Sequence, residues 1–365
     1  MSNFTSALLD WFAENGRDLP WRQTRDPYAV WLSEIILQQT QVKQGWDYWQ
    51  RFIHRWPTVE QLAAATEDEV LREWQGLGYY SRARNLHFAA RQIVDLGHFP
   101  NTFEEIRQLK GVGDYTAAAI GSIAFGLPVA VVDGNVFRVL SRHYGIATPI
   151  NTTAGKKEFT LLAQSLLPTD SSTYNQAIMD FGAIQCTPKS PCCQQCPLQE
   201  SCVALCEGRV AELPVKTGKL KTMERWLSYI YIRYNGQTAI HRRGAGDIWQ
   251  GLWEPLLIEQ KDKKTEVRDV IAALNDMKGT EKQLTAVNGI ANGQLSINGK
   301  NNNQLTLLRS GMRHVLTHRL IIADFYLWQP KERPILPDGY IWIDEADIDN
   351  YGVPRLVEIM LEMTC

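Results

Sequence analysis

Residues 109–142 read LKGVGDYTAAAIGSIAFGLPVAVVDGNVFRVLSR, and the expected fold is built around this stretch. Gly111 and Gly113 interrupt two helical patterns, and glycine tolerates positive φ angles and lets a backbone approach a ligand closely. We therefore expect a tight hairpin between two helices. The second helix opens near Thr116 with small residues, and the N–H groups at its N-terminus would favour a phosphate.

A single acidic residue, Asp133, ends the apolar run that begins at Pro128, and Gly134 and Asn135 follow it. A lone carboxylate in front of a predicted helix is either the N-cap of that helix or a catalytic group. This stretch alone leaves both interpretations open.

Length and composition describe a globular protein with room for two domains. The chain has 365 residues, of which 44% are hydrophobic and 21% charged. No apolar stretch is long enough to span a bilayer, and the N-terminus lacks the pattern of a signal peptide, so we expect a cytoplasmic protein. The net charge of −2 offers no broad positive field. Any DNA contact must come from locally arranged side chains and backbone amides.

The first half of the chain is expected to be all-helical. Apolar residues recur at helical spacing in four segments, residues 4–15, 66–74, 81–96 and 102–110. Convincing strand alternation is absent before the second half. We expect an active site in a cleft between two helical layers.

Glu34 is the most unusual acidic residue of this half. It lies in PYAVWLSEIILQQTQV, residues 27–42, between Trp31 and Ile35. Burial among these residues would raise the pKa of the carboxyl group, as a general acid at neutral pH requires. The alternative is a glutamate that points outward from an amphipathic helix.

Several motifs then occur together: LPW at 19–21, WLSEIILQQTQV at 31–42, GLGYYSRARNLH at 76–87, and the GVG hairpin followed by VDGN. In combination they resemble adenine DNA glycosylases of the MutY type, members of the helix-hairpin-helix superfamily that remove adenine mispaired with 8-oxoguanine. The resemblance implies that Gly111 and Gly113 belong to a DNA-binding hairpin.

The resemblance also implies catalytic roles. Glu34 would protonate the departing adenine at N7, and Asp133, kept ionised by N–H groups at its helix start, would stabilise or capture the sugar cation. Tyr115 and Asn135 would flank the sugar. Related lyases such as endonuclease III carry a lysine where this chain has Tyr115, and a phenol cannot form a Schiff base. We therefore expect a monofunctional hydrolase that acts on a flipped base.

Five further residues are implied to meet DNA. Gln39 and Tyr79 would enter the duplex near 8-oxoguanine, Thr40 would contact that base, and Arg82 and Arg84 would lie near phosphates. Without the resemblance, Tyr79 and its neighbour Tyr80 read as ordinary core aromatics.

A cysteine cluster lies near residue 200. Its spacing is C-x6-C-x2-C-x5-C, formed by Cys186, Cys193, Cys196 and Cys202. Four thiolates suit either tetrahedral zinc or a [4Fe–4S] cluster, and the spacing leaves that choice open. The resemblance implies [4Fe–4S], which we expect to position a loop at the DNA backbone. Three cysteines fall outside the pattern and are expected to be free thiols, namely Cys192, Cys206 and Cys365.

The second half changes character. A polar segment precedes strand-like patterns around the turn Asn235-Gly236. This part resembles the α+β, Nudix-like C-terminal domain of the MutY type, but the glutamate-rich Nudix helix is missing after Gly251. We expect a binding domain without pyrophosphohydrolase activity. The predicted organisation is a helical domain at 1–206 with the cluster loop at 186–202, a connector at 207–225 and the Nudix-like domain at 226–365.

Within that domain, Leu316-Thr317-His318 matches the loop that reads Phe-Ser-His in the family and senses 8-oxoguanine. A hydroxyl and an imidazole remain available for hydrogen bonds to the lesion, whereas leucine replaces the aromatic wedge. The alternative for His318 is a buried histidine between strands.

The implied partner is double-stranded DNA with adenine opposite 8-oxoguanine or guanine. We expect a monomer without membrane contact, associated with the nucleoid if bacterial. Two alternatives stay open: a helix-hairpin-helix glycosylase of another mismatch specificity, and a catalytically silent DNA-binding protein.

Overall fold

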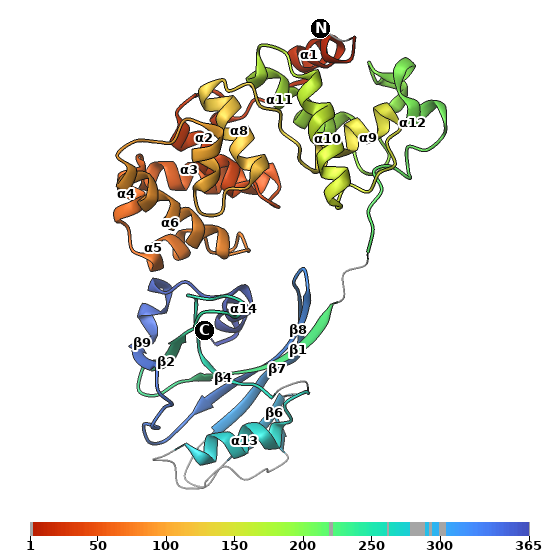
Figure 1. The fold of residues 1–365 in the computed structure, drawn as a ribbon. Helices are drawn as coiled ribbons and strands as arrows, with labels where there is room; N and C mark the ends of the chain where they lie inside the picture. Colours follow the sequence, from red (N-terminus) through yellow and green to blue (C-terminus); the bar gives the residue numbers. More distant parts are fainter. Residues whose placement is uncertain are drawn as a thin grey trace. The chain divides into compact units, whose positions relative to one another are not determined.

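A computed structural model describes residues 3–218, 222–260, 263–277, 289–291, 294–298 and 304–364 (Figure 1). Backbone contacts divide the chain into two units. The first contains Met1–Ala65 and Arg84–Lys219, and the second contains Thr66–Ala83 and Leu220–Cys365. The helical segment Thr66–Ala83 therefore groups with the C-terminal residues.

The first unit is helical, and among the described residues no strand precedes Met223. Its elements are α1 (Asn3–Asn15), η1 (Pro20–Arg22), α2 (Pro27–Ile36), α3 (Val42–Arg55), α4 (Val59–Ala64), most of α6 (Ser81–Leu96), α7 (Phe103–Gln108), α8 (Asp114–Phe125), α9 (Gly134–Tyr144), α10 (Thr153–Leu166), α11 (Ser171–Asp180), η2 (Phe181–Gln185), η3 (Cys193–Gln195), η4 (Gln199–Ser201) and α12 (Val203–Cys206). Helix α2 begins after Asp26, whose side chain accepts hydrogen bonds from two N–H groups of the first turn, and proline opens it.

Helices α7 and α8 form the expected hairpin. Gly111 adopts a left-handed conformation with φ 81°, which explains the glycine there. Gly113 does not, because it is the N-cap of α8 with φ −99° and ψ −179°, an extended conformation open to any residue. The tolerance of glycine for positive φ is therefore used at Gly111 and not at Gly113.

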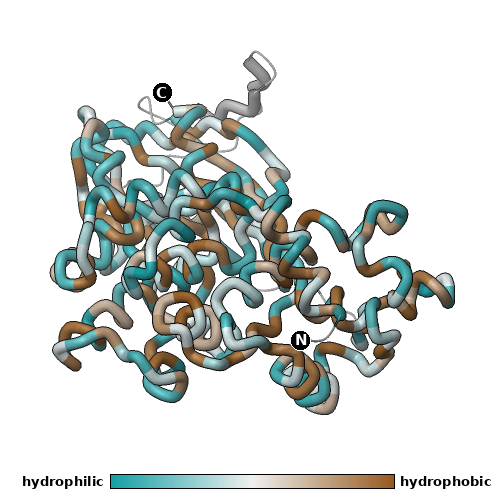
Figure 2. The backbone as a smooth tube through the Cα atoms, turned by 90° about the horizontal axis from the view of Figure 1, so that it is seen from above, coloured by the Kyte–Doolittle hydropathy of each residue, from teal (hydrophilic) through white to brown (hydrophobic). Residues whose placement is uncertain are grey.

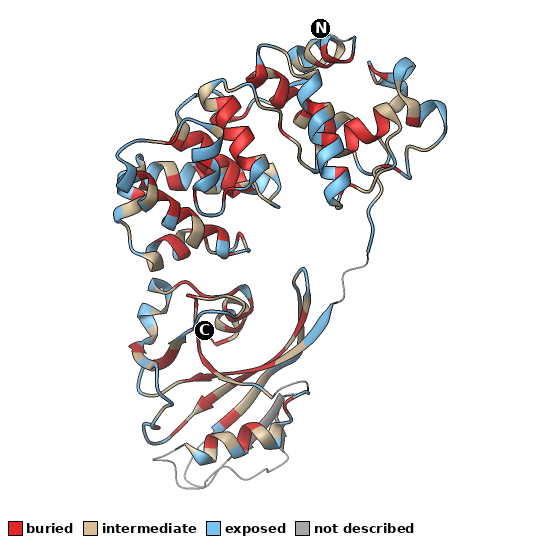
Figure 3. Ribbon diagram, in the orientation of Figure 1, coloured by how far each residue is buried: buried red, intermediate tan, exposed pale blue. Residues whose placement is uncertain are grey.

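Helix α8 is the central helix of this unit. Its residues from Thr116 to Ile123 are all buried (Figure 3), because small side chains let neighbouring helices pack close to it. Helices α2, α7 and α11 contact it. The core cluster on one side joins Ala119 to Val139 of α9 and Ile178 of α11.

Hydrophobic and hydrophilic residues alternate at short intervals along the backbone in Figure 2. Within the described ranges, no helix is long and apolar enough to cross a membrane.

The second unit contains two sheets. The larger has the strand order β4-β1-β8-β7-β6-β5, and the smaller β3-β2-β9. Its elements are α5 (Glu67–Glu73), β1 (Met223–Ile232), β2 (Gln237–Arg242), β3 (Trp253–Glu254), β4 (Leu256–Ile258), α13 (Val267–Asp276), β5 (Gly289–Ala291), β6 (Gln294–Asn298), β7 (Gln304–Val315), β8 (Arg319–Gln329), β9 (Tyr340–Asp344), η6 (Glu345–Asn350) and α14 (Arg355–Thr364). Strands β3 and β4 occupy the segment after Gly251 where a Nudix enzyme would carry its glutamate-rich helix.

Strand β1 is parallel to β8 and begins inside the predicted connector, because Met223 already pairs with Arg319. Successive residues of β1 face opposite sides of the sheet. Ile230 packs in the core that includes Val270 of α13, whereas Tyr229 packs in the core that includes Leu356 of α14. Burial on both faces accounts for the nearly continuous apolar run of this strand.

Candidate active site

A cavity of about 560 Å³ lies in the first unit. Residues of η1, α2, α8, α9 and α11 line it, so distant parts of the sequence meet there. All four predicted catalytic residues are among them: Glu34, Tyr115, Asp133 and Asn135. Thr40 also lines this cavity.

Glu34 lies on α2 and is only 8% exposed, so the alternative of an outward-pointing glutamate is wrong. Its Oε2 accepts a hydrogen bond of 2.9 Å from the Tyr115 hydroxyl. Burial, with a smaller contribution from the nearby charge of Asp133, raises the pKa of Glu34 to about 7, although the Tyr115 hydrogen bond acts to lower it. The carboxyl group is thus able to hold a proton near neutral pH.

The sequence left open whether Asp133 caps a helix or belongs to a functional site. In the structure it is the N-cap of α9 and also lines the cavity. Its Oδ1 accepts hydrogen bonds of 2.8 Å from the N–H groups of Asn135 and Val136, and its Oδ2 accepts one of 2.8 Å from the Asn135 side chain. Burial nevertheless raises the pKa of Asp133 above its usual value, against these hydrogen bonds. The expectation that N–H donors would keep this pKa low is therefore wrong, because loss of water outweighs them.

Asn135 is held in turn by Arg138, a residue that the sequence analysis missed. The Arg138 guanidinium donates 2.8 Å to the Asn135 side-chain oxygen and, through Nε, 2.7 Å to the backbone oxygen of Cys186. A line of hydrogen bonds therefore runs from Asp133 to the start of the cysteine loop. The signal in the sequence was an arginine three residues, about one helical turn, beyond Asn135.

Tyr115 lies near the N-terminus of α8, and its hydroxyl also lies 3.5 Å from the sulfur of Met179. Burial, and then the charges of Glu34 and Asp133, raise the pKa of Tyr115 well above its ordinary value. The phenol therefore stays protonated and acts as a hydrogen-bond donor in this site.

A second missed group is an ion cluster at the cavity. Asp180, which is fully buried, accepts hydrogen bonds of 2.8 and 2.9 Å from Arg22 and Arg17, and both arginines line the cavity. Although burial opposes ionisation, these hydrogen bonds hold the pKa of Asp180 below its usual range. The charge of Arg22 also acts to lower the pKa of Glu34.

The residues implied to enter DNA share an unusual backbone. Gln39 and Tyr79 have φ angles of 57° and 48°, in the left-handed region that side chains other than glycine rarely adopt, and both are exposed. Tyr80, by contrast, is buried, so the core interpretation is correct for Tyr80 and wrong for Tyr79. Arg82 is also buried, donating to the Gly78 oxygen and lying over Trp74, which contradicts its expected place near phosphates.

Leu316-Thr317-His318 forms the tip of the β7–β8 hairpin, where the Leu316 N–H donates 2.8 Å to the Arg319 oxygen. Thr317 and His318 are exposed, so the alternative of a buried histidine is wrong. The hydroxyls of Thr317 and Tyr79 are hydrogen-bonded at 2.9 Å. Two of the predicted lesion contacts, far apart in sequence, therefore touch within the second unit.

The four cysteines of the spacing pattern line one small cavity of about 30 Å³, together with Cys192. Arg142 donates 3.4 Å to the Cys186 sulfur, and more strongly to the backbone oxygen of Thr187 at 2.7 Å. In the described part of the chain, no three Cys, His, Asp or Glu side chains are grouped as ligands of one metal ion. Cys192 and Cys206 are exposed and free, and Cys365 lies outside the described residues.

Two protein families match the chain. The HhH-GPD superfamily of base excision DNA repair proteins matches residues 32–165, and the NUDIX domain matches residues 228–363. The adenine DNA glycosylase of Buchnera aphidicola (subspecies Schizaphis graminum) is 36% identical over 254 residues, which cover 68% of this chain and 73% of that protein. The adenine DNA glycosylase of Rattus norvegicus is 45% identical over 226 residues, 58% of this chain and 44% of that protein. The alignment thus spans less than half the length of the rat relative.

Among solved structures, a thermostable thymine-DNA glycosylase is similar with a TM-score of 0.53 and 32% identity, over 56% of this chain and 95% of that one. The similarity therefore accounts for nearly all of that protein but little more than half of this chain.

Proposed function

Since the chain belongs to the adenine DNA glycosylases of the helix-hairpin-helix superfamily, we propose that it removes adenine from DNA in which adenine is mispaired with 8-oxoguanine or guanine. The observation that carries this proposal is the burial of Glu34 beside Asp133 in one cavity. Cleavage of an N-glycosidic bond needs a proton donor for the leaving base and an anion for the sugar cation, as in glycoside hydrolysis.

In this proposal Glu34 is the proton donor. Its pKa of about 7 leaves a substantial protonated fraction at neutral pH, and the Tyr115 hydroxyl fixes its Oε2 at 2.9 Å. The other oxygen is then available to the departing adenine. A cavity of about 560 Å³ falls within the range of small-ligand sites, so it has room for a base swung out of the duplex.

Asp133 carries the second role. Two backbone N–H groups and the Asn135 amide hold its carboxylate, so little reorganisation is needed when positive charge develops on the sugar. The same carboxylate is placed to stabilise the cation or to capture it covalently. Because Tyr115 offers no amine, we propose hydrolysis to an abasic site without strand cleavage.

Recognition of 8-oxoguanine is proposed for Tyr79 and the hairpin tip. The 2.9 Å hydrogen bond between Tyr79 and Thr317 makes these two contacts one surface, and the exposed His318 beside them offers an imidazole. Gln39, exposed and in left-handed conformation, is proposed to fill the space of the displaced base from the first unit.

We further propose that the four patterned cysteines hold a [4Fe–4S] cluster. A [4Fe–4S] cluster takes one thiolate at each iron, and the four patterned cysteines line one shared cavity. Its contribution would be structural, since Arg138 and Arg142 tie this loop to α9. Iron and sulfide in equal amounts and a brown absorption band would support the cluster; a colourless zinc protein would contradict it.

The thymine-DNA glycosylase likeness supports a second candidate, an enzyme of the same chemistry for another mismatch. The NUDIX match at residues 228–363 favours adenine removal, because the thymine enzyme is similar over only 56% of this chain, which already covers 95% of that enzyme. A silent DNA-binding protein would have no need of two carboxyl groups in one cavity.

A single-turnover assay separates these candidates. We expect release of adenine from duplexes with adenine opposite 8-oxoguanine, slower release opposite guanine, and strand breaks only after alkali. Thymine release from a thymine–guanine duplex, or no base release at all, would overturn the proposal.

A further inference from the structure

The segment between β2 and β3, residues 243–252, contacts both strands of the hairpin whose tip is Leu316-Thr317-His318. We call this segment the brace loop. Asp247 of the loop accepts a hydrogen bond of 3.3 Å from Arg319, the first residue of β8. Trp249 of the loop lies with its ring centre 5.9 Å from that of His314, near the end of β7.

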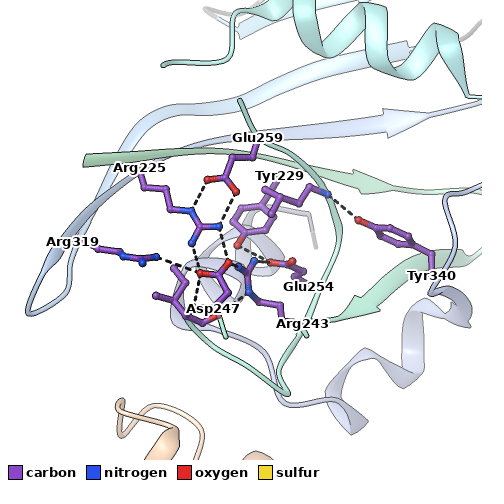
Figure 4. A network of polar contacts seen from close by, with 10 residues as sticks. Arg225, Tyr229, Arg243, Asp247, Glu254, Glu259, Arg319 and Tyr340 are labelled. Atoms are coloured by element: carbon purple, nitrogen blue, oxygen red, sulfur yellow. Dashed lines mark hydrogen bonds and ion pairs between the residues drawn. The ribbon is translucent and has the colours of Figure 1, made fainter. Parts of the chain in front are cut away.

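Asp247 is the centre of a network of charged side chains (Figure 4). Besides Arg319, it accepts hydrogen bonds of 2.5 and 2.7 Å from Arg225 of β1, a bond from Arg243, and one of 2.7 Å from the N–H of Ile248. One carboxylate thus joins the brace loop, strand β1 and the base of the hairpin.

The rest of the network fixes the loop itself. Arg243 and Glu254 are 5% and 4% exposed and are bonded at 2.5 Å, and the Tyr229 hydroxyl donates 2.9 Å to the same glutamate oxygen. Buried charges persist only when each has a partner in good geometry. We therefore expect the loop to have one favoured conformation. In this conformation Trp249 adopts a left-handed φ of 57°.

The hairpin tip has few supports of its own. Thr317 and His318 are exposed, and the neighbouring Val315 is 76% exposed. Two backbone hydrogen bonds act at the turn, from Leu316 N–H to the Arg319 oxygen and from Met223 N–H to the His318 oxygen. Apart from the Thr317–Tyr79 hydrogen bond, the direction of the tip is therefore set at its base, where the brace loop meets Arg319 and His314.

We propose that Asp247 and Trp249 are positioning residues for 8-oxoguanine recognition, acting through Arg319 and His314 on the orientation of the hairpin tip. This inference rests on the proposed function of the tip. Neither residue needs to touch DNA for its loss to weaken discrimination, because a small displacement of Thr317 and His318 would misplace their hydrogen-bonding groups.

The test compares Asp247→Asn with Glu259→Gln in the full-length protein. Glu259 belongs to the same network and accepts hydrogen bonds from Arg225, but among the described residues no hydrogen bond or ion pair joins it to the hairpin. The readout is the ratio of single-turnover rates, adenine opposite 8-oxoguanine against adenine opposite guanine. We expect Asp247→Asn to lower this ratio by about tenfold. We expect Glu259→Gln to leave it nearly unchanged.

An unchanged ratio in Asp247→Asn, or an equal loss in Glu259→Gln, would overturn the inference. If Asp247→Asn fails to fold, Trp249→Phe and Arg319→Gln test the two arms separately, since Arg319 is partly exposed. Equal weakening on both duplexes in Arg319→Gln, with a smaller salt dependence of binding, would show a phosphate contact and contradict positioning. A natural protein that lacks preference for 8-oxoguanine would instead overturn the proposed function.

Discussion

Glu34 and Asp133 share a cavity but differ in their partners, and this difference decides which one carries the proton. Glu34 has a single phenol donor, while Asp133 has two N–H groups and a side-chain amide. Burial raises both pKa values. Because the charged form of Asp133 is better hydrogen-bonded, we expect Glu34 to be the one of the two that carries a proton near neutral pH.

The first prediction concerns Glu34→Gln. We expect base release to fall about 10²- to 10⁴-fold, the usual contribution of a positioned general acid. We expect the variant to be more stable than the natural protein at pH 8. The pKa of Glu34 is about 7 in the folded chain against an ordinary value of 4.5, so its favourable contribution is complete below pH 4.5 and is lost as pH rises through 7. Thermal unfolding at pH 5 and pH 8 measures this difference.

The pH dependence of base release by the natural protein provides the control. Rates of the natural protein should decline above pH 7 as Glu34 loses its proton. Full activity in Glu34→Gln, or a stability difference that shrinks between pH 5 and pH 8, would contradict the assignment.

At this scale, the sequence predicts a residue well when its neighbours in the chain create its environment. Glu34 sits in an apolar run, and burial follows from that run. Asp180 could not be predicted, because its partner Arg22 is 158 residues away. The raised pKa of Asp133 could not be predicted for the same reason. Residues of other helices bury its carboxyl group and exclude water, whereas only its N–H donors are close in the sequence.

At the scale of elements, the α7–α8 hairpin contains two glycines, and the structural requirement for glycine differs between the two positions. At Gly111 the φ of 81° strains any side chain, and a Cβ there would lie 2.8 Å from the Cβ of Asn85. At Gly113 the backbone is extended and a Cβ would meet no atom within 4 Å. The fold requires the first glycine and does not require the second. We therefore expect that close approach of a ligand accounts for Gly113.

The second prediction separates these reasons. Gly111→Ala should destabilise the protein by about 1–3 kcal/mol through backbone strain and the Asn85 contact. Gly113→Ala should leave the unfolding temperature nearly unchanged and weaken binding to duplex DNA by about tenfold, because its methyl group would meet a phosphate. Chemical unfolding and a fluorescence binding titration measure the two effects. Normal DNA affinity in Gly113→Ala would exclude a close backbone contact at this position.

Element boundaries followed the sequence closely where capping residues mark them. The segment predicted at 81–96 is helical over Ser81–Leu96, and the segment at 102–110 is helical over Phe103–Gln108 after the Thr102 cap. The start of β1 was placed too late, because pairing with Arg319 extends the strand back to Met223. Such pairing depends on a residue 96 positions further along and leaves no local pattern.

Across the whole molecule, the sequence predicted a helical part followed by an α+β part, since periodicity changes between them. It could not predict that Thr66–Ala83 groups with the C-terminal residues, because nothing local distinguishes α5 from other short helices. The grouping has a visible basis in side chains. Arg242 of β2 pairs with Glu67 and Asp68 at 3.0 Å each, and the Gln75 side chain accepts a hydrogen bond from the Val353 N–H.

The third prediction follows from this grouping and concerns Tyr79 and Thr317, whose hydroxyls meet across 238 residues. If this bond orients both side chains toward 8-oxoguanine, Tyr79→Phe and Thr317→Val should each reduce the preference for that lesion. The double variant should then lose less than the sum, with a coupling of about 0.5–1.5 kcal/mol. The measurement is the affinity of the natural protein, the two single variants and the double variant for DNA with an abasic site opposite 8-oxoguanine and opposite guanine. Thr306→Val, at the far end of β7, should combine additively with Tyr79→Phe. Additivity in the Thr317 cycle as well would mean that Tyr79 and Thr317 recognise DNA independently, and that the hydrogen bond between them is structural alone.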